Sequence, residues 1–293
     1  MIAPLMACPP PDPNPRMPAT KAPPGSCDTH AHVFGPTERY PLSPKRGYDP
    51  APAPLEAYRH LLAALGVSRA VLVQPSVYGT DNSAMLDAVG QDPVNKRAVV
   101  AVTSAATDDE LRAFHAAGAR GIRVNLVDPG GMPFDSLGDV GRFAERLAPL
   151  GWHVEYLVHV HDFPEIDALA RMPVDTVVGH FGYMAAAHGI DHPGFRRFLK
   201  LFEGGRIWVK MTAPYRISGR ADMPYDDVTP FARVLREARP DRLLWGTDWP
   251  HVMNKKPMAN DGDMFDCIAE WLPTEDLRRQ VLAENPNRLY GFG

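Results

Sequence analysis

The sequence predicts a protein of the α/β class that folds as a single (β/α)8 barrel. Short apolar runs rich in β-branched residues alternate along the chain with amphipathic runs of helical period. Eight such pairs occur over roughly 270 residues, which is the usual size of one barrel of this kind. Most of the apolar runs show no polar alternation, as is typical of parallel strands that are covered on both faces.

Each element of the barrel can be placed in order along the chain. The expected strands lie at 26–32, 69–75, 97–103, 120–126, 152–158, 174–180, 206–212 and 241–247. The expected helices lie near 54–65, 82–91, 107–117, 138–148, 162–171, 193–203, 226–238 and 263–272. The run Thr107-Asp-Asp-Glu is a start signal for the third helix. A doubly wound open sheet is the second choice, but the turn after the first strand reads HVFGP and lacks the Gly-rich phosphate fingerprint.

A proline-rich segment precedes the barrel. Residues 1–24 include Pro9, Pro10 and Pro11 in a row, so we expect an extended arm at 1–24 and the barrel at 25–293. The start of the arm has no basic region and its apolar stretch is interrupted by prolines, so we do not interpret it as a signal peptide. The three cysteines are widely spaced and form no CxxC, which predicts reduced thiols in a cytoplasmic protein.

The composition excludes several classes of protein. The chain has 293 residues, 45% hydrophobic and 23% charged, as expected for a globular fold rather than a disordered chain. The formal net charge is -4 and the pI about 6.3, so we expect neither nucleic acid nor an anionic membrane as a partner. No apolar run approaches the ~18 residues of a membrane span. The sequence does not decide between a monomer and a homo-oligomer.

Histidine and aspartate residues stand where the predicted strands end. In (β/α)8 barrels these carboxyl ends carry the active site. His30 and His32 close the first strand, and their i, i+2 spacing places both on one side. His180 closes the sixth strand, and Asp248 follows the eighth in the run WGTDWPH. Because tryptophans flank Asp248, we expect partial desolvation, a raised pKa and a role as general base.

Two arginines and several polar residues are expected at the same end. Arg123 lies inside an apolar strand, where a cation needs a carboxylate partner from the protein or from a ligand. Arg216 follows the seventh strand in TAPYRISGR, which contains no acidic residue, so we expect it to bind the ligand. Lys210 lies earlier on that strand and is expected to pair within the barrel. Further candidates near the strand ends are Tyr48, Ser76, Tyr156, His159 and His161.

The motifs at the strand ends resemble one branch of the amidohydrolase superfamily. The motifs are CDTHAHVFGP, VVGHFG, WVKMTAPYR and WGTDWPH, together with the ending ENPNRLYGFG. The branch contains 2-pyrone-4,6-dicarboxylate lactonase and related sugar-acid and muconolactone-type enzymes. The resemblance spans residues 25–293. It implies a distorted (β/α)8 barrel that opens the lactone ring of a small anionic metabolite, carboxylated or sulfonated, in the catabolism of aromatic or sugar acids.

The resemblance also implies a role for each matching residue. Asp248 would be the general base that activates water. Three histidines would polarise the substrate carbonyl, namely His30, His32 and His180. Five residues would bind the substrate, namely Tyr48, Ser76, Arg123, Tyr156 and Arg216. No metal is expected to be required, because the pyrone lactonase is active without one. The alternative is one divalent ion, Zn or Mn, on four ligands, namely His30, His32, His180 and Asp248.

The sequence differs from this branch in two places, and three other functions remain possible. The stretch LVDPGGMPFD lacks the further arginine of the pyrone lactonase, so we expect the substrate to carry one main acid group. The register of the fifth strand leaves the roles of Tyr156 and His159 undecided. The other functions are a metal-dependent decarboxylase of an aromatic or muconate-type acid, a lactone isomerase, and a barrel that binds without catalysis. A serine nucleophile is not expected, because no GxSxG motif is present.

Overall fold

Eight parallel strands form a nearly closed barrel in the computed structural model, which describes residues 5–128 and 132–292. The strands follow one another around the barrel in chain order, and each overlaps a strand expected from the sequence. They are β2 (Cys27–Ala31), β4 (Arg69–Val73), β5 (Lys96–Val100), β6 (Ala119–Asn125), β7 (His153–Leu157), β8 (Thr176–Val178), β9 (Ile207–Met211) and β10 (Leu243–Trp245). The (β/α)8 prediction is confirmed.

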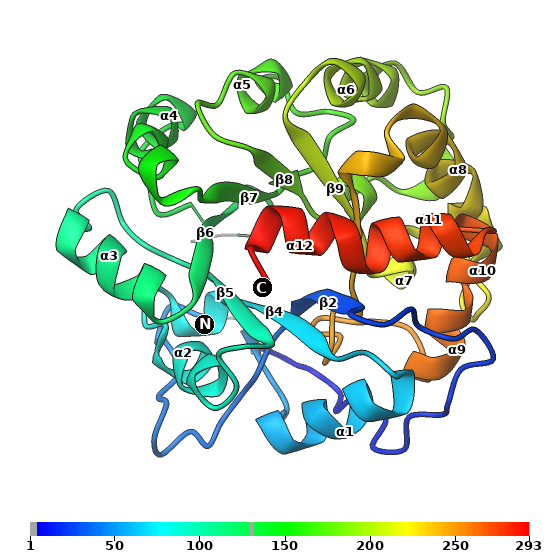
Figure 1. Ribbon diagram of the computed structural model, residues 1–293, viewed down its shortest axis with the longest axis horizontal. Helices are drawn as coiled ribbons and strands as arrows, with labels where there is room; N and C mark the ends of the chain where they lie inside the picture. The colour runs from blue at the N-terminus through cyan, green and yellow to red at the C-terminus, as the bar shows by residue number, and fades with distance from the viewer. Residues whose placement is uncertain (1–4, 129–131, 293) are drawn as a thin grey trace.

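Most of the helices surround the strands as an outer ring, and α12 crosses one end of the barrel (Figure 1). The α-helices are α1 (Leu55–Leu65), α2 (Ser83–Gly90), α3 (Asp108–Ala116), α4 (Leu137–Glu145), α5 (Ile166–Ala170), α6 (Pro193–Gly204), α7 (Pro214–Ile217), α8 (Thr229–Ala238), α9 (Asp261–Asp266), α10 (Ile268–Trp271), α11 (Glu275–Arg279) and α12 (Asn285–Tyr290). Helix α3 begins at the predicted capping box, in which Thr107 and Glu110 bind each other's backbone N–H. Among the described residues, no helix has the length and apolarity needed to cross a bilayer.

The Asp28 carboxylate joins the first strand of the barrel to the last. It accepts hydrogen bonds from the backbone and the hydroxyl of Thr247, at 2.9 and 2.5 Å, and from the hydroxyl of Tyr58 at 2.8 Å. Burial raises the pKa of Asp28 to about 6, although these hydrogen bonds favour the charged form. The next residue after Thr247, Asp248, donates its backbone N–H to the carbonyl of His30 at 2.8 Å. The seam between β2 and β10 therefore sets the position of Asp248 relative to His30.

The amino-terminal end of the barrel is covered by the C-terminal helices. The sequence did not predict α11 and α12, because Pro273 and Pro286 interrupt the helical pattern. Helix α12 crosses the barrel axis (Figure 1). Three residues of the segment pack against the barrel interior, namely Leu289, Tyr290 and Phe292. Their partners on the strands are Cys27, Val71, Val73, Val99, Val177, Trp208 and Leu244. With this end filled by apolar side chains, the carboxyl end of the barrel is left for a functional site.

The proline-rich arm lies against the barrel from residue 5 onward. Its short strand β1 (Met6–Ala7) pairs in parallel with β3 (Tyr48–Asp49), in the loop after β2. Cys8 is buried, and its Sγ accepts the backbone N–H of Met253 at 3.2 Å. Further along, the backbone N–H groups of Arg16 and Thr20 donate to side chains at the start and end of α9. The arm therefore contacts two of the loops that surround the carboxyl end of the barrel.

Candidate active site

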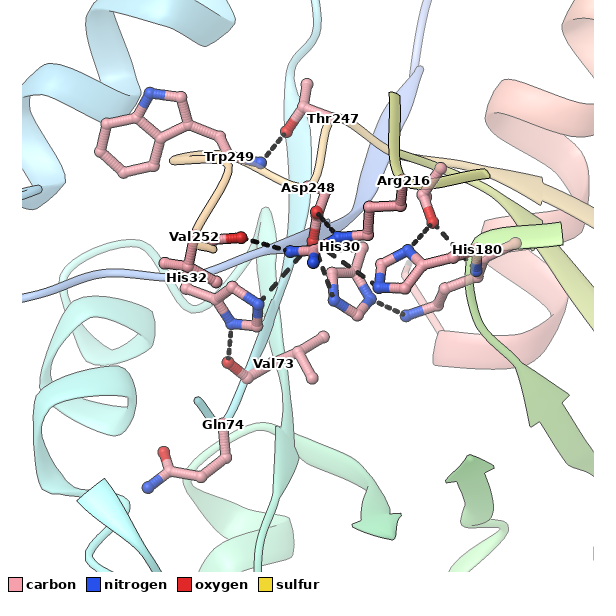
Figure 2. Close-up of polar contacts among 12 residues, drawn as sticks. His30, His32, Val73, Gln74, His180, Arg216, Thr247, Asp248, Trp249 and Val252 are labelled. Atoms are coloured by element: carbon pink, nitrogen blue, oxygen red, sulfur yellow. Dashed lines mark hydrogen bonds and ion pairs between the residues drawn. The ribbon is translucent and has the colours of Figure 1, made fainter. Parts of the chain in front are cut away.

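Three histidines and one aspartate meet at the carboxyl end of the barrel (Figure 2). His30 lies on β2 and His32 directly after it, His180 begins the short helix η3 (His180–Gly182) after β8, and Asp248 follows β10. The ring centroid of His30 lies 5.1 Å from that of His32 and 5.0 Å from that of His180. All four side chains are buried. The structure therefore brings together the residues that the strand-end argument singled out.

The two oxygens of Asp248 have different surroundings. Oδ2 accepts hydrogen bonds from the hydroxyl of Tyr215 at 2.5 Å and from Nε of Arg216 at 2.9 Å. Oδ1 lies 3.6–3.9 Å from the Nε2 atoms of the three histidines. Among the described residues Oδ1 has no hydrogen-bond partner, although it is buried. One oxygen is thus held in place by the protein, and the other is left to interact with a bound molecule or ion.

The backbone at the site adopts the left-handed conformation at three strand ends. His180 has a φ of 51°, Ala213 of 52° and Asp248 of 63°. None of these residues is glycine, so each conformation costs about 1–3 kcal/mol and persists only where the surrounding structure enforces it. The turns aim His180 and Asp248 across the mouth of the barrel, and Ala213 begins the turn that brings Tyr215 and Arg216 to Asp248. Strain of this kind is typical of functional sites.

The hydrogen bonds of His32 and His180 give the two rings different roles. Nδ1 of His32 lies 2.7 Å from the carbonyl oxygen of Val73, which can only accept, so this nitrogen carries the proton and Nε2 presents a lone pair. Nδ1 of His180 lies 2.7 Å from the hydroxyl of Thr212, which can either donate or accept. His180 can therefore carry its proton on Nε2 and donate it into the site, whereas neutral His32 cannot.

The donor set at the mouth of the barrel fits a divalent metal ion. The ligand atoms of His30, His180 and Asp248 all lie within 4.8 Å of one another. Nε2 of His30 and Oδ1 of Asp248 are buried and have no hydrogen-bond partner among the described residues. Imidazole nitrogens with one carboxylate oxygen are ligands that suit Zn and Mn. The residues could thus hold such an ion, with His32 beside them as a further nitrogen.

The expectation of a raised pKa for Asp248 is wrong. Burial does raise the pKa of this carboxyl, as its tryptophan neighbours suggested, but the Arg216 guanidinium and the three imidazoles outweigh burial and hold the pKa well below its usual range. Burial lowers the pKa of His32 to about 4, with the Arg123 guanidinium in addition, and lowers that of His180 to about 3. Near neutral pH the site therefore contains an ionised carboxylate and neutral imidazoles.

Arg216 has an acidic partner, contrary to the expectation from the sequence. Its own segment TAPYRISGR carries no carboxylate, but the side chain reaches Asp248, which lies 32 residues away along the chain. Nη2 also donates to the backbone oxygen of Val252 at 2.6 Å (Figure 2). Because its charge is paired with Asp248, Arg216 supports the carboxylate, and its removal would disturb the aspartate as well as any bound ligand.

Arg123 faces an open cleft. Its Nη1 donates to the backbone oxygen of Gln74 at 2.7 Å. Among the described residues no carboxylate forms an ion pair with it. Arg123 and Ser76 line this cleft. Tyr48 is buried near Ser76 and the Arg123 guanidinium. Three of the expected substrate-binding residues thus lie together, and a free guanidinium suits a carboxylate or sulfonate.

Tyr156 is not brought to the site. On β7 the preceding residue, Glu155, points into the barrel, where its carboxylate contacts Lys210 and His30, so Tyr156 points toward the helices. Tyr156 is fully buried in the same apolar cluster as Phe143 of α4. His159 lies beyond the strand, where it stacks on Tyr183 with ring centroids 4.8 Å apart. Lys210 pairs within the barrel, as the sequence predicted.

Two polar residues of the site were missed in the sequence. Tyr215 donates its hydroxyl to Asp248, and Thr212 positions the His180 ring. Both stand in the run TAPYR after the seventh strand, so their position at a strand end was the available signal. The sequence could not show which of them faces Asp248, because the left-handed turn at Ala213 redirects the chain at this point.

The chain belongs to the amidohydrolase family, whose model, described as "Amidohydrolase", matches residues 27–292. The fold and the histidine–aspartate site agree with this assignment. A 4-sulfomuconolactone hydrolase from Hydrogenophaga intermedia is 38% identical over 276 residues, covering 92% of this chain and 89% of the relative. A 2-pyrone-4,6-dicarboxylate hydrolase from Comamonas testosteroni is 39% identical over 286 residues, covering 94% of this chain and 93% of the relative.

A solved structure gives a similar result. A probable 2-pyrone-4,6-dicarboxylic acid hydrolase from Acinetobacter baumannii, crystallised with citric acid bound, superimposes with a TM-score of 0.78 at 27% identity. The match covers 92% of this chain and the whole length, 100%, of that chain. The sequence-based recognition of the amidohydrolase superfamily, and of the branch with lactone hydrolases, is confirmed.

Proposed function

We propose that this amidohydrolase hydrolyses the ring ester of a small anionic lactone. The observation that carries the proposal is Asp248, which is kept ionised by Arg216 and has one oxygen free at the end of the barrel where Arg123 lines a cleft. The relatives named as hydrolases of 4-sulfomuconolactone and of 2-pyrone-4,6-dicarboxylate support both the reaction and an acidic substrate. The cleft that Arg123 lines is formed by residues that follow β4, β5 and β6, at the same end of the barrel as Asp248.

Ring opening by this site begins with a water molecule. Oδ1 of Asp248 and the Nε2 lone pair of His32 accept the hydrogens of the water and orient its oxygen toward the lactone carbonyl. As the new C–O bond forms, one proton passes to Asp248. His180 donates its Nε2–H to the carbonyl oxygen, which becomes the oxyanion of the tetrahedral intermediate. The ring C–O bond then breaks, and the leaving oxygen takes the proton back from Asp248.

This division of roles differs from the expectation that all three histidines polarise the carbonyl. A neutral ring whose proton is on Nδ1 has no hydrogen to offer at Nε2, so His32 acts as an acceptor. His180 has the freedom to donate because its partner is the hydroxyl of Thr212. One oxyanion contact of this type is typically worth about 2.7–4 kcal/mol. A divalent ion bound to the same residues would supply Lewis-acid polarisation of the carbonyl.

A panel of matched lactones tests the proposed function. We expect ring-opened acid as the product, and faster turnover of lactones with one carboxylate or sulfonate than of the matched neutral rings. The reason is that Arg123 lines the cleft without a carboxylate partner among the described residues. Rings with two acid groups are expected to gain little from the second group, because Arg216 is already paired. Chromatography of the products measures each rate. Release of carbon dioxide instead of a ring-opened acid would support the decarboxylase.

Removal of metal ions is expected to leave lactone hydrolysis in place. The Arg216 guanidinium keeps Asp248 ionised, so the carboxylate does not depend on a metal ion for its charge. The measurement compares turnover before and after dialysis against a chelator, with the metal content determined for each sample. Loss of activity on chelation, and its return with Zn or Mn, would make the ion an essential part of the site instead.

A further inference from the structure

The proline-rich arm joins two neighbouring loops at the carboxyl end of the barrel. Its strand β1 pairs with β3, which contains Tyr48, and the backbone N–H of Cys8 donates to the carbonyl oxygen of Asp49 at 2.8 Å. The Cys8 side chain, 8% exposed, accepts the backbone N–H of Met253 at 3.2 Å. The arm therefore bridges the loop after the first barrel strand, β2, and the loop after the last, β10.

The loop after β10 is held in a strained conformation. Three of its non-glycine residues have a left-handed backbone, namely Asp248, with a φ of 63°, His251, also 63°, and Met253, with 57°. Such conformations persist only where the surrounding structure enforces them. The hydrogen bond from Met253 to Cys8 is a contact of this kind, and it comes from a segment that lies outside the barrel.

Two further contacts lead from this loop to Asp248. The carbonyl oxygen of Val252, the residue before Met253, accepts a hydrogen bond from Nη2 of Arg216 at 2.6 Å (Figure 2). Nε of the same guanidinium donates to Oδ2 of Asp248 at 2.9 Å. Burial raises the pKa of the Cys8 thiol, against the opposing effects of the Met253 N–H and the Arg216 guanidinium, so the thiol is neutral and lies close to Arg216. A shift of the Val252 carbonyl would therefore move the guanidinium and, with it, the carboxylate.

The rest of the arm has a defined seat at the start of α9. The backbone N–H of Arg16 donates to Oδ1 of Asn260 at 2.9 Å. Nδ2 of Asn260 donates in turn to the carboxylate of Asp12 at 2.8 Å and to the carbonyl oxygen of Asn14 at 2.9 Å. A Cβ atom on Gly262 would lie 2.2 Å from the carbonyl oxygen of Arg16, so only glycine leaves room for the arm at this position. These contacts fix the arm in one place along α9.

We propose that residues 6–16 form a strap that positions the loop after β10, with Cys8 as the positioning residue whose hydrogen bond holds the Val252 carbonyl against Arg216. The strap acts on Asp248 through Arg216. Its effect on turnover rests on the proposed hydrolase function, whereas its effect on the loop does not.

Two substitutions of Cys8 test the strap. Valine is similar in size but cannot accept the Met253 N–H, whereas the hydroxyl of serine can. We expect Cys8→Val to speed hydrogen exchange of the Met253 amide, measured by nuclear magnetic resonance. We also expect it to lower kcat by about 10–100-fold with little change in KM, because small displacements of catalytic groups are costly. Cys8→Ser should remain close to the wild type in both measurements.

The control for these variants removes another cysteine. The thiol of Cys267 donates to the backbone oxygen of Pro224 at 3.6 Å. Cys267→Val is expected to leave the Met253 amide and the rate unchanged. Thermal unfolding shows which variants are folded.

Gly262→Ala tests whether the strap moves as one unit. The added methyl group must push Arg16 away from α9, whereas Gly90→Ala in α2 adds a methyl group in open space and is the matched control. In Gly262→Ala we expect iodoacetamide to modify Cys8, as located by mass spectrometry of peptides, and kcat to fall as in Cys8→Val. Cys27, which is 0% exposed, should remain unmodified in both proteins.

Each result bears on a separate part of the proposal. Equal exchange of the Met253 amide in the wild type and in folded Cys8→Val would overturn it, even if Gly262→Ala does not fold. A Cys8 that stays protected in folded Gly262→Ala would refute a strap that moves as one unit. Faster exchange with an unchanged kcat would refute the positioning of Arg216. A wild-type protein that opens no lactone would count against the proposed function, while exchange and alkylation would still decide whether the strap holds the loop.

Discussion

Asp248→Asn is expected to lower kcat by about 10²–10⁴-fold, the usual contribution of a general base. Arg216 and Tyr215 both donate to Oδ2, so the amide oxygen of the new side chain will take that place. The amide NH₂ group must then occupy the position of Oδ1, among the three imidazoles. An acceptor for the nucleophilic water is thereby replaced by a donor. Steady-state kinetics on an anionic lactone, with product analysis, measure the effect.

The control for this variant is another carboxylate that is paired with an arginine. Asp175 accepts hydrogen bonds from Arg242 and Trp208 at the amino-terminal end of the barrel. Asp175→Asn is expected to retain turnover, and thermal unfolding shows whether each variant is folded. A folded Asp248→Asn protein with a kcat near that of the wild type would exclude Asp248 as the base.

Arg123→Met is expected to lower kcat/KM for acidic lactones by roughly 10–150-fold, mainly through KM. A hydrogen bond to a charged group is worth about 1.5–3 kcal/mol. The acid group of the substrate keeps its charge during ester cleavage, so its binding is similar in the ground state and the transition state, and its loss raises KM. The measurement compares a lactone that carries an acid group with the matched neutral lactone. The variant should lose most of the preference for the acidic one.

Variants of two other arginines serve as controls for this comparison. Arg120 lies on the same strand, and its Nη1 donates to backbone oxygens at the amino-terminal end. Arg120→Met should keep the preference for acidic lactones. Arg216→Met should lower kcat instead, because it removes the partner of Asp248. If Arg123→Met discriminates between the two lactones as strongly as the wild type, the acid group is bound elsewhere.

The positions of the histidines and of Asp248 could be predicted because they depend on strand order alone. Parallel strands place their carboxyl ends at one mouth, so His30, His180 and Asp248 had to meet once eight strands were recognised. The i, i+2 spacing placed His32 beside His30, and the ring centroids are indeed 5.1 Å apart.

Strand order alone could not predict which way a side chain points, or which distant residue pairs with a charged group. Tyr156 and Glu155 are neighbours, and a shift of one residue in the assumed register exchanges the inward and the outward position. The partner of Arg216 lies on another strand end, so a search of its own segment found none. The pKa of Asp248 follows from that same pairing, because the charge of Arg216 outweighs the burial that the tryptophans predicted.

The hydrogen bonds between Asp28 and Thr247 have a consequence for folding while the chain is being synthesised. The two residues are 219 positions apart. At ~5–20 residues per second, Thr247 is made about 10–45 s after Asp28. During that time the first strand has no neighbour on its open side, and the interior valines of β4 and β5 still lack the C-terminal residues Leu289, Tyr290 and Phe292 that cover them. Unpaired strand edges and uncovered apolar surface promote aggregation, and chaperones bind to them. The nascent chain therefore depends most on chaperones in the interval between its first barrel strand and its last.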